Sequence, residues 1–252
     1  MSRERGRFLI GTSGFHYDHW RGVFYPPRLP KEAWFGHYAR RFETVEINNT
    51  FYGLPEPETV DAWRERAPEG FVYAVKFSRY GSHMKKLKAP EETIPNFLSR
   101  LRRLQDHLGP ILVQLPPRWR ADPERLDAFL ACAPEEERWA LEFRDPSWLA
   151  DEVFDVLESR GAALCVHDML PDHPRRPTAD FIYLRFHGPG EERYQGSYPH
   201  QALTAEARRI ADELDEGLDV YAYFNNDPGG RAVDNARDLR RYVRRALKRG
   251  NG

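Results

Sequence analysis

The sequence predicts an α/β fold, a (β/α)8 barrel of the TIM type, in which eight parallel strands alternate with helices. Eight short apolar, β-branched or aromatic runs recur along the 252 residues, with helix-like segments between them. A chain of about 250 residues is the usual size for this barrel. Several runs are almost unbroken apolar sequence, as is typical of parallel strands covered on both faces. We therefore expect a single domain over 8–249, preceded by a polar extension over 1–7.

The predicted strands follow the apolar runs, and the predicted helices follow apolar residues at helical spacing. The strands are 7–12, 44–48, 71–77, 111–115, 139–144, 163–167, 181–187 and 219–225. The clearest helical stripes are Ile94, Phe97, Leu98, Leu101, Leu104 and Leu108; Leu203, Ala207, Ile210, Ala211 and Leu214; and Val233, Ala236, Leu239, Tyr242, Val243 and Leu247. A doubly wound open sheet is the competing architecture, but no glycine fingerprint follows the first strand.

Two connections depart from the regular alternation. The segment 168–180 contains three prolines and no helical periodicity. Because proline breaks helical hydrogen bonding, we expect the sixth helix to be missing or reduced to a turn. The first connection, 13–29, is long and rich in aromatic residues, and long loops after barrel strands often carry function.

Composition excludes several classes of protein. Lys and Arg total 38 against 39 Asp and Glu, which gives a net charge of −1 and argues against polybasic binding. Two cysteines, Cys132 and Cys165, are too few for a disulfide framework. No stretch approaches the roughly 18 apolar residues of a membrane span, and no signal peptide is present. We expect a cytoplasmic protein without a membrane partner.

Polar residues stand at the carboxyl end of nearly every predicted strand, where barrel active sites are built. Residues two apart on a strand share a face, which pairs Glu46 with Asn48, Glu142 with Arg144 and Arg185 with His187. The further candidates are Thr12, Lys76, His83, Gln114, Asn225 and Asn226. His167 and Asp168 have opposite parities, so only one of them should point inward.

This set of side chains predicts an anion site with acid–base chemistry. Lys76, Arg144 and Arg185 would bind the anion, because a guanidinium matches a carboxylate or phosphate bidentately. Glu46 and Glu142 are the candidate acid–base groups, and His187 is a candidate for proton transfer. The residues that would contact other polar groups of the ligand are Thr12, Asn48, His83, Gln114, Asn225 and Asn226. Each glutamate could instead be a structural counter-ion, Glu142 of Arg144 and Glu46 of Lys76.

Other segments have two readings each. Gly229-Gly230 is either a phosphate-binding turn at a helix start or only a tight turn. The loop 79–86, together with the aromatic residues of the first loop, suits nucleotides or single strands, or is an ordinary solvated loop. The cations of the last helix read as its solvated face. A metal is conceivable from Glu46, Glu142, His167, Asp168 and His187, but no diagnostic ligand spacing exists, so we assign no metal ligand and leave the cofactor open.

The motifs resemble the YecE-like family, whose domain is catalogued as being of unknown function. The matching blocks are Gly11-Thr-Ser-Gly14 with Tyr17 and Trp20, Phe24-Tyr-Pro26, Val45-Glu-Ile-Asn48 with Thr50-Phe-Tyr52 and Pro55, Val75-Lys76 with His83, Gln114-Leu-Pro-Pro117, Glu142-Phe-Arg144 with Ser147-Trp148, Tyr183-Leu-Arg185 with His187-Gly188, and Tyr223-Phe-Asn-Asn226 with Ala232 and Asn235-Ala236. The resemblance covers about Phe8 to Val243 and implies a TIM-type barrel, similar in outline to sugar isomerases and apurinic-site endonucleases. It implies no reaction, and the metal clusters of those enzymes are not matched here, so no metal is carried over.

We expect an enzyme, a hydrolase or an isomerase, that acts on a small phosphorylated or carboxylated substrate at the barrel mouth. The alternative is a nucleic-acid-binding or phosphodiester-processing protein, and a third reading is a metabolite sensor without turnover. The sequence leaves the substrate and the oligomeric state open.

Overall fold

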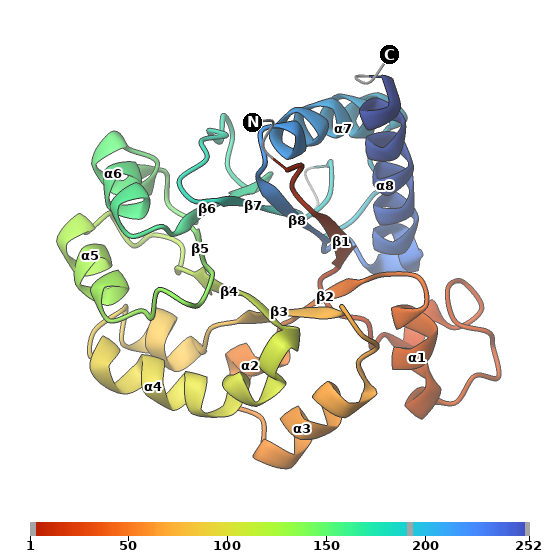
Figure 1. The fold of residues 1–252 in the computed structure, drawn as a ribbon, viewed down its shortest axis with the longest axis horizontal. Helices are drawn as coiled ribbons and strands as arrows, with labels where there is room; N and C mark the ends of the chain where they lie inside the picture. Colours follow the sequence, from red (N-terminus) through yellow and green to blue (C-terminus); the bar gives the residue numbers. More distant parts are fainter. Residues whose placement is uncertain (1–3, 191–193, 250–252) are drawn as a thin grey trace. The chain divides into compact units, whose positions relative to one another are not determined.

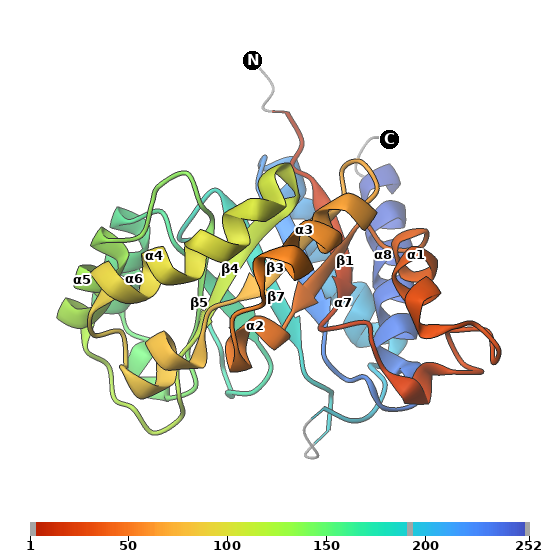
Figure 2. The ribbon, with the colours of Figure 1, turned by 90° about the horizontal axis from the view of Figure 1, so that it is seen from below.

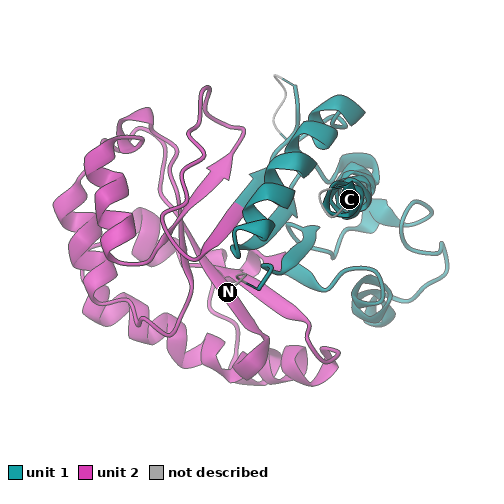
Figure 3. Ribbon diagram, turned by 45° about the horizontal axis from the view of Figure 1, so that its top comes forward, with its two compact units in different colours: residues 1–45, 184–252 teal, residues 46–183 magenta. Residues whose placement is uncertain are grey.

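The computed structural model describes residues 4–190 and 194–249. The chain forms two compact units, one made of residues 1–45 and 184–252 and the other of residues 46–183 (Figure 3). We call them unit 1 and unit 2. The prediction of a single domain over 8–249 stays a prediction.

The described residues contain eight strands, each within a few residues of its predicted place (Figure 1). They are β1 (Phe8–Thr12), β2 (Thr44–Ile47), β3 (Val72–Lys76), β4 (Leu108–Gln114), β5 (Trp139–Glu142), β6 (Ala163–His167), β7 (Phe181–Phe186) and β8 (Asp219–Phe224). Hydrogen bonds connect them in the order β1-β8-β7-β6-β5-β4-β3-β2. The pairs β1–β8, β3–β4, β4–β5 and β5–β6 are parallel. The (β/α)8 fold class is confirmed.

Helices occupy the connections between these strands, except the one after β6 (Figures 1 and 2). They are α1 (Trp34–Ala39), α2 (Asn49–Tyr52), α3 (Pro57–Arg66), α4 (Pro90–Leu101), α5 (Pro123–Ala131), α6 (Asp151–Ser159), α7 (His200–Asp215) and α8 (Arg231–Arg249). Three of them, α3, α4 and α5, begin with proline, which lacks an N–H that the first helical position would leave unused.

The predicted apolar stripes face the core, with one correction. Ile94, Phe97 and Leu101 of α4 are fully buried, whereas Leu108 is the first residue of β4 and not the end of the helix. The helical conformation of the chain is interrupted at Gln105, whose φ of 53° and ψ of −129° are not helical. Periodicity alone missed this break, since a leucine at helical spacing can also begin a strand.

Segment 168–180 has no helix, as predicted. Its residues instead bind the elements before it. The Thr178 hydroxyl accepts a bond from the Leu164 N–H at 2.8 Å and donates to the Ala162 carbonyl at 2.7 Å. The Arg176 guanidinium pairs with Glu158 of α6 at 2.7 Å and with Asp151 at 3.0 Å. Side-chain bonds therefore replace the packing that a helix would supply.

The first loop is held by its own aromatic side chains. Trp20 and Tyr25 are buried, and the Tyr25 ring stacks on Trp34 of α1 with centroids 4.5 Å apart. The Trp20 indole N–H donates to the Asp227 carbonyl at 2.9 Å, which ties this loop to the segment after β8. These rings are core groups of unit 1 and are not open stacking faces.

The Gly229-Gly230 pair fits a tight turn at the start of α8. Their φ values are 66° and 74°, in the left-handed region that favours glycine. A Cβ at Gly230 would lie 2.7 Å from Val23 Cγ1. The backbone geometry thus accounts for both glycines as turn residues, and phosphate binding by this turn stays a prediction.

The same crowding at Gly11 of β1 yields a prediction about stability. A Cβ at Gly11 would lie 2.2 Å from the Thr44 backbone oxygen. We expect Gly11→Ala to lower the free energy of unfolding by about 1–3 kcal/mol, the usual cost of overpacking, as measured by urea denaturation. In the matched control, Gly36→Ala in α1, the nearest atom is Arg40 Nη1 at 3.8 Å. There we expect a gain of about 0.5–1 kcal/mol from helix propensity. Equal stabilities of the two variants would contradict the prediction.

Candidate functional site

Two carboxylates lie fully buried in unit 2. Glu46 lies near the carboxyl end of β2, and Glu142 is the last residue of β5. Neither side chain has any exposed surface. Carboxylates are seldom buried to this degree unless they are paired. Their partners therefore determine what the site can do.

Glu142 pairs with a cation on its own side of β5. Arg144 Nε donates to Glu142 Oε1 in a short ion pair, and the Arg144 side chain is 9% exposed. The strand register places Gln114 of β4 directly beside Glu142, and the Cys165 thiol of β6 lies 4.0 Å from the other carboxylate oxygen. The pairing of Glu142 with Arg144 follows from strand parity, and it is the counter-ion arrangement considered above.

Two neutral side chains donate hydrogen bonds to Glu46. The Tyr183 hydroxyl of β7 donates to Glu46 Oε2 at 2.7 Å, and Asn48 Nδ2 donates to Oε1 at 3.4 Å. The partners of the two buried carboxylates thus include a guanidinium for Glu142 and a phenol and an amide for Glu46.

Lys76 completes this group at the end of β3. Its ammonium donates to Gln114 Oε1 at 2.6 Å and lies 4.5 Å from the centre of the Phe51 ring. The side chain is only 9% exposed. The Thr50 hydroxyl donates to the Lys76 carbonyl at 2.6 Å, which fixes α2 against β3 and so places Phe51 under the ammonium.

His83 lies on a single π-helical turn, Tyr80–Met84, after β3. Its ring contacts Phe51, with centroids 4.9 Å apart. The Ser82 hydroxyl donates to the Ser78 carbonyl, so the His83 Nδ1–H donates to Ser82 Oγ at 3.0 Å. Burial, together with the neighbouring Lys76 charge, lowers the pKa of His83 to about 4. His83 is neutral at pH 7, with Nε2 as an acceptor.

At the end of β6, His167 points inward and the next residue, Asp168, points outward, as their opposite parities predict. His167 is 4% exposed, whereas Asp168 is exposed. His167 Nδ1 accepts the Met169 N–H at 3.1 Å, and Nε2 therefore donates to the Phe143 carbonyl at 2.7 Å. Burial lowers the pKa of His167 to about 3. Both ring nitrogens of His167 are therefore hydrogen-bonded to the backbone.

The candidates of unit 1 lie at the carboxyl ends of β1, β7 and β8. Arg185 is 2% exposed and donates from Nη2 to Ser13 Oγ at 3.3 Å. His187 is 1% exposed, with its ring 5.7 Å from Tyr194. The Thr12 hydroxyl donates to the Gly14 carbonyl at 2.6 Å.

The two asparagines after β8 differ in burial. Asn225 is half-buried, and its backbone N–H donates to the Phe186 carbonyl at 2.7 Å. Asn226 is fully buried and donates from Nδ2 to Gly196 O at 2.8 Å and to Asn235 Oδ1 at 2.9 Å. Asn226 therefore fastens the loop before α7 and the start of α8 to the end of β8.

Unit 2 thus contains seven of the predicted residues, and unit 1 contains the other five. The seven are Glu46, Asn48, Lys76, His83, Gln114, Glu142 and Arg144; the five are Thr12, Arg185, His187, Asn225 and Asn226. In the described ranges, no three His, Cys, Asp or Glu side chains gather closely enough to hold a metal ion.

Sequence reasoning missed three side chains of this group. Tyr183 shares the parity of Arg185 and Cys165 shares that of His167, so strand alternation contained the signal for both. His173 was not detectable, because it lies in the irregular segment 168–180. Its ring lies 4.5 Å from that of His167. Burial lowers the pKa of His173, against smaller opposing effects of the Pro174 carbonyl and the Glu142 charge.

Comparison with known proteins establishes the family. The sequence profile described as "Protein of unknown function DUF72" matches residues 9–251. The chain belongs to the DUF72 family. This confirms the resemblance to YecE-like proteins.

Relatives of this DUF72 protein include YecE of Escherichia coli K12, 33% identical over 153 residues. That match covers 58% of this chain and 56% of YecE, so the chain spans about half the length of that relative. YunF of Bacillus subtilis is 24% identical over 91% of this chain and 92% of its own.

Solved structures show the same fold. A DUF72 family protein of Thermotoga maritima is 28% identical, with a TM-score of 0.81 over 96% of this chain and 99% of the other. A D-psicose 3-epimerase, at 12% identity and a TM-score of 0.54, shares the fold alone; the match covers 97% of each chain. Within 4–190 and 194–249, none of the helices has the length and apolar character that crossing a bilayer requires.

The position of His83 beside Lys76 yields a prediction about pH. We expect an NMR titration to give His83 a pKa of about 4, which rises in Lys76→Gln because that variant removes a neighbouring positive charge. The ordinary pKa of histidine is 6.5, so the stability that a neutral His83 contributes is present above about pH 6.5 and is lost as the pH falls towards 4.

The exposed Lys88 provides the control, since it is not among the charges that act on His83. Lys88→Gln should leave the His83 titration unchanged. A His83 pKa near 6.5 in the wild-type protein would show that burial and Lys76 do not act as described.

Proposed function

We propose that this DUF72 protein is an enzyme, a hydrolase or an isomerase, that acts on a small phosphorylated or carboxylated substrate by carboxylate acid–base chemistry. The proposal is supported chiefly by one observation. Two fully buried glutamates, Glu46 and Glu142, lie in unit 2 together with a nearly buried lysine and arginine. Burial and neighbouring charges can shift the pKa of a carboxylate towards the value that acid–base catalysis needs.

Arg144 and Lys76 supply the positive charge for the substrate. A guanidinium carries five N–H donors in a planar fork, and this fork matches a phosphate or carboxylate geometrically. The Lys76 ammonium, which donates to Gln114, adds a second charge.

Glu46 is the proposed general acid–base group. Two of its partners, the Tyr183 phenol and the Asn48 amide, orient the carboxylate. Glu142 is proposed to hold Arg144 in place and to share in proton transfer. Neutral His83, with Nε2 as an acceptor, is proposed to contact a hydroxyl of the substrate.

The residues of unit 1 keep their predicted roles as proposals. Arg185 would bind the anion, and His187 would transfer a proton. Thr12, Asn225 and Asn226 would contact polar groups of the substrate, although the Thr12 hydroxyl and the Asn226 amide N–H groups already donate to protein carbonyls.

A thermal-shift screen of sugar phosphates and organic acids tests the anion site. We expect at least one ligand to raise the Tm of the wild-type protein by about 5 °C near saturation, given the usual stabilisation by bound ligands. Glu142→Gln/Arg144→Gln should abolish that shift, because it removes the guanidinium without leaving a buried charge unpaired. Arg64→Gln, which changes a cation of α3, should keep it. A shift of equal size in the double variant would refute the anion site.

Turnover of a ligand found in that screen tests the acid–base role. We expect Glu46→Gln to retain the ligand-induced Tm shift and to lose about 10²–10⁴-fold in kcat, the usual contribution of general acid–base catalysis. Product formation is followed by NMR, with Glu65→Gln in α3 as the control. Binding without turnover in the wild-type protein would instead favour a metabolite sensor.

Nucleic-acid binding is the second candidate, and it is favoured by the surface of the loop after β3. Tyr80 is 41% exposed with Lys85 Nζ 5.3 Å from its ring centre, and Tyr52 is 79% exposed. Exposed aromatic rings beside cations suit the stacking of single-stranded bases. This reading predicts oligonucleotide affinity that falls linearly with salt on a log–log plot and weakens in Tyr80→Ala. Binding no tighter than that of a neutral barrel protein at about 50 mM salt would remove it.

A further inference from the structure

Helix α8 of unit 1 is rich in positively charged side chains. Eight of its 19 residues are Arg or Lys and two are Asp, in a chain whose net charge is −1. Six of these cations line a single hollow of about 330 Å³. They are Arg237, Arg240, Arg241, Arg244, Arg245 and Lys248.

These cations repel one another and have few acidic partners. Residues three or four apart are neighbours on a helix surface, and like charges at that spacing are destabilising. In the part of the chain that the structure describes, Arg241 alone of the six forms an ion pair, with Asp238 at 2.7 Å. A solvated helix face more often mixes both signs. An anion from outside the chain would relieve this repulsion.

Two of the arginines are already held in position. The Arg237 guanidinium lies 5.3 Å from the centre of the Phe24 ring, and that of Arg240 lies 5.4 Å from the Phe42 ring. Arg240 Nη1 also donates to the Arg41 carbonyl at 2.6 Å. Burial lowers the pKa of Arg240, and the adjacent Arg244 charge lowers it further. Side chains held in this way lose less conformational entropy on binding than free ones.

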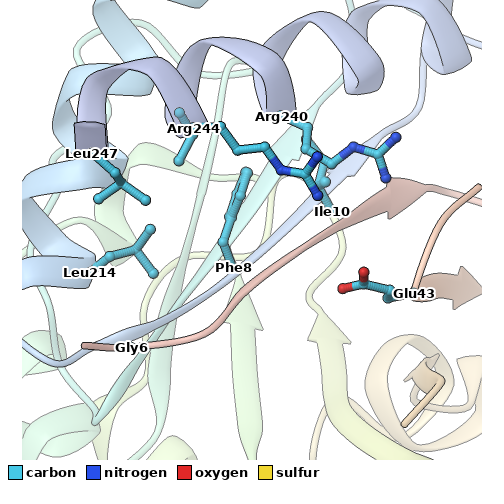
Figure 4. A pocket seen from close by; sticks show the side chains of 9 residues that line it. Gly6, Phe8, Ile10, Glu43, Leu214, Arg240, Arg244 and Leu247 are labelled. Carbon is cyan, nitrogen blue, oxygen red and sulfur yellow. The ribbon is translucent and has the colours of Figure 1, made fainter. Parts of the chain in front are cut away.

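An apolar cavity adjoins the cationic hollow. It has a volume of about 220 Å³, and Arg240 and Arg244 line both spaces. Figure 4 shows Phe8 of β1 between the two guanidinium groups and the pair Leu214 and Leu247. The other lining residues are Gly6, Ile10, Glu43 and Val243. Phe8 is the first residue of β1 and Gly6 precedes it, so both lie at the opposite end of that strand from Thr12.

We propose that this face of unit 1 binds a small, water-soluble organic diphosphate or triphosphate, with its phosphates on the cations of α8 and an apolar or aromatic group in the cavity. Guanidinium groups match phosphate oxygens bidentately, and several cations in one hollow suit a ligand with several negative charges. The hollow lies in the size range of small-molecule sites. Because the adjoining cavity is lined mainly by apolar side chains, the organic part of the ligand should be apolar or aromatic.

Other occupants fit less well. A membrane surface favours large apolar side chains that project beside the cations, yet the exposed large hydrophobic residues of the described chain all lie outside α8: Val23, Tyr52, Tyr80, Met84 and Tyr194. A nucleic-acid backbone would use the cations and leave the apolar cavity empty.

Isothermal titration calorimetry with geranyl diphosphate, inorganic pyrophosphate and orthophosphate tests the proposal at about 0.15 M salt, where exposed charges are screened. We expect geranyl diphosphate to bind more tightly than pyrophosphate, and pyrophosphate more tightly than orthophosphate. Arg240→Gln/Arg244→Gln should weaken both diphosphates at least tenfold. Leu247→Asn should weaken geranyl diphosphate severalfold and leave pyrophosphate unchanged, because it changes only the cavity.

Arg120→Gln/Arg209→Gln removes the same charge from two exposed positions outside the hollow and should leave all affinities unchanged. An equal loss in this control would mean that the attraction is only to overall charge, and the site would be refuted. Failure of both diphosphates to bind, or geranyl diphosphate binding no tighter than pyrophosphate, would also refute it. Tighter binding of anionic vesicles or an oligonucleotide, lost in Arg240→Gln/Arg244→Gln, would assign the face to those partners and overturn the proposal.

Discussion

A buried charge must be matched by a partner, and this constraint organises the polar end of unit 2. Glu142 has no exposed surface, so its carboxylate would carry a large desolvation cost without Arg144. The two residues share a strand face, and Gln114 of the neighbouring strand stands beside them in register. Gln114 in turn accepts from Lys76. The register of β4 and β5 therefore connects the Glu142–Arg144 ion pair, through Gln114, to the second cation, Lys76.

The same constraint applies to Glu46, which is as deeply buried as Glu142. Its carboxylate accepts hydrogen bonds from Tyr183 of β7 and from Asn48. Hydrogen-bond donors orient a buried carboxylate and offset part of the cost of removing it from water. The neighbouring strands therefore determine which donors meet each glutamate.

Periodicity predicted the fold well because burial on both faces of a strand leaves a strong apolar signal. All eight strands lie close to their predicted positions, and the helix missing after β6 was visible in three prolines. The error at Leu108 has a physical cause. A leucine at helical spacing satisfies either a helix or the start of a strand, and the backbone of Gln105 decides between them. For the candidate site, strand alternation paired Glu142 with Arg144 and Glu46 with Asn48. It did not reveal His173, which lies in an irregular segment without a period.

The sequence by itself determined the strands, the absent helix, the facing pairs of polar residues and the membership of a family, because these depend on local alternation and on motifs. Only the tertiary structure decided which donors meet each carboxylate, since Tyr183 and Glu46 are far apart in the chain and meet through the sheet. It also decided that Trp20 and Tyr25 of the first loop are packed and that two arginines of α8 border an apolar cavity. Both results depend on contacts between distant segments, which no local pattern encodes.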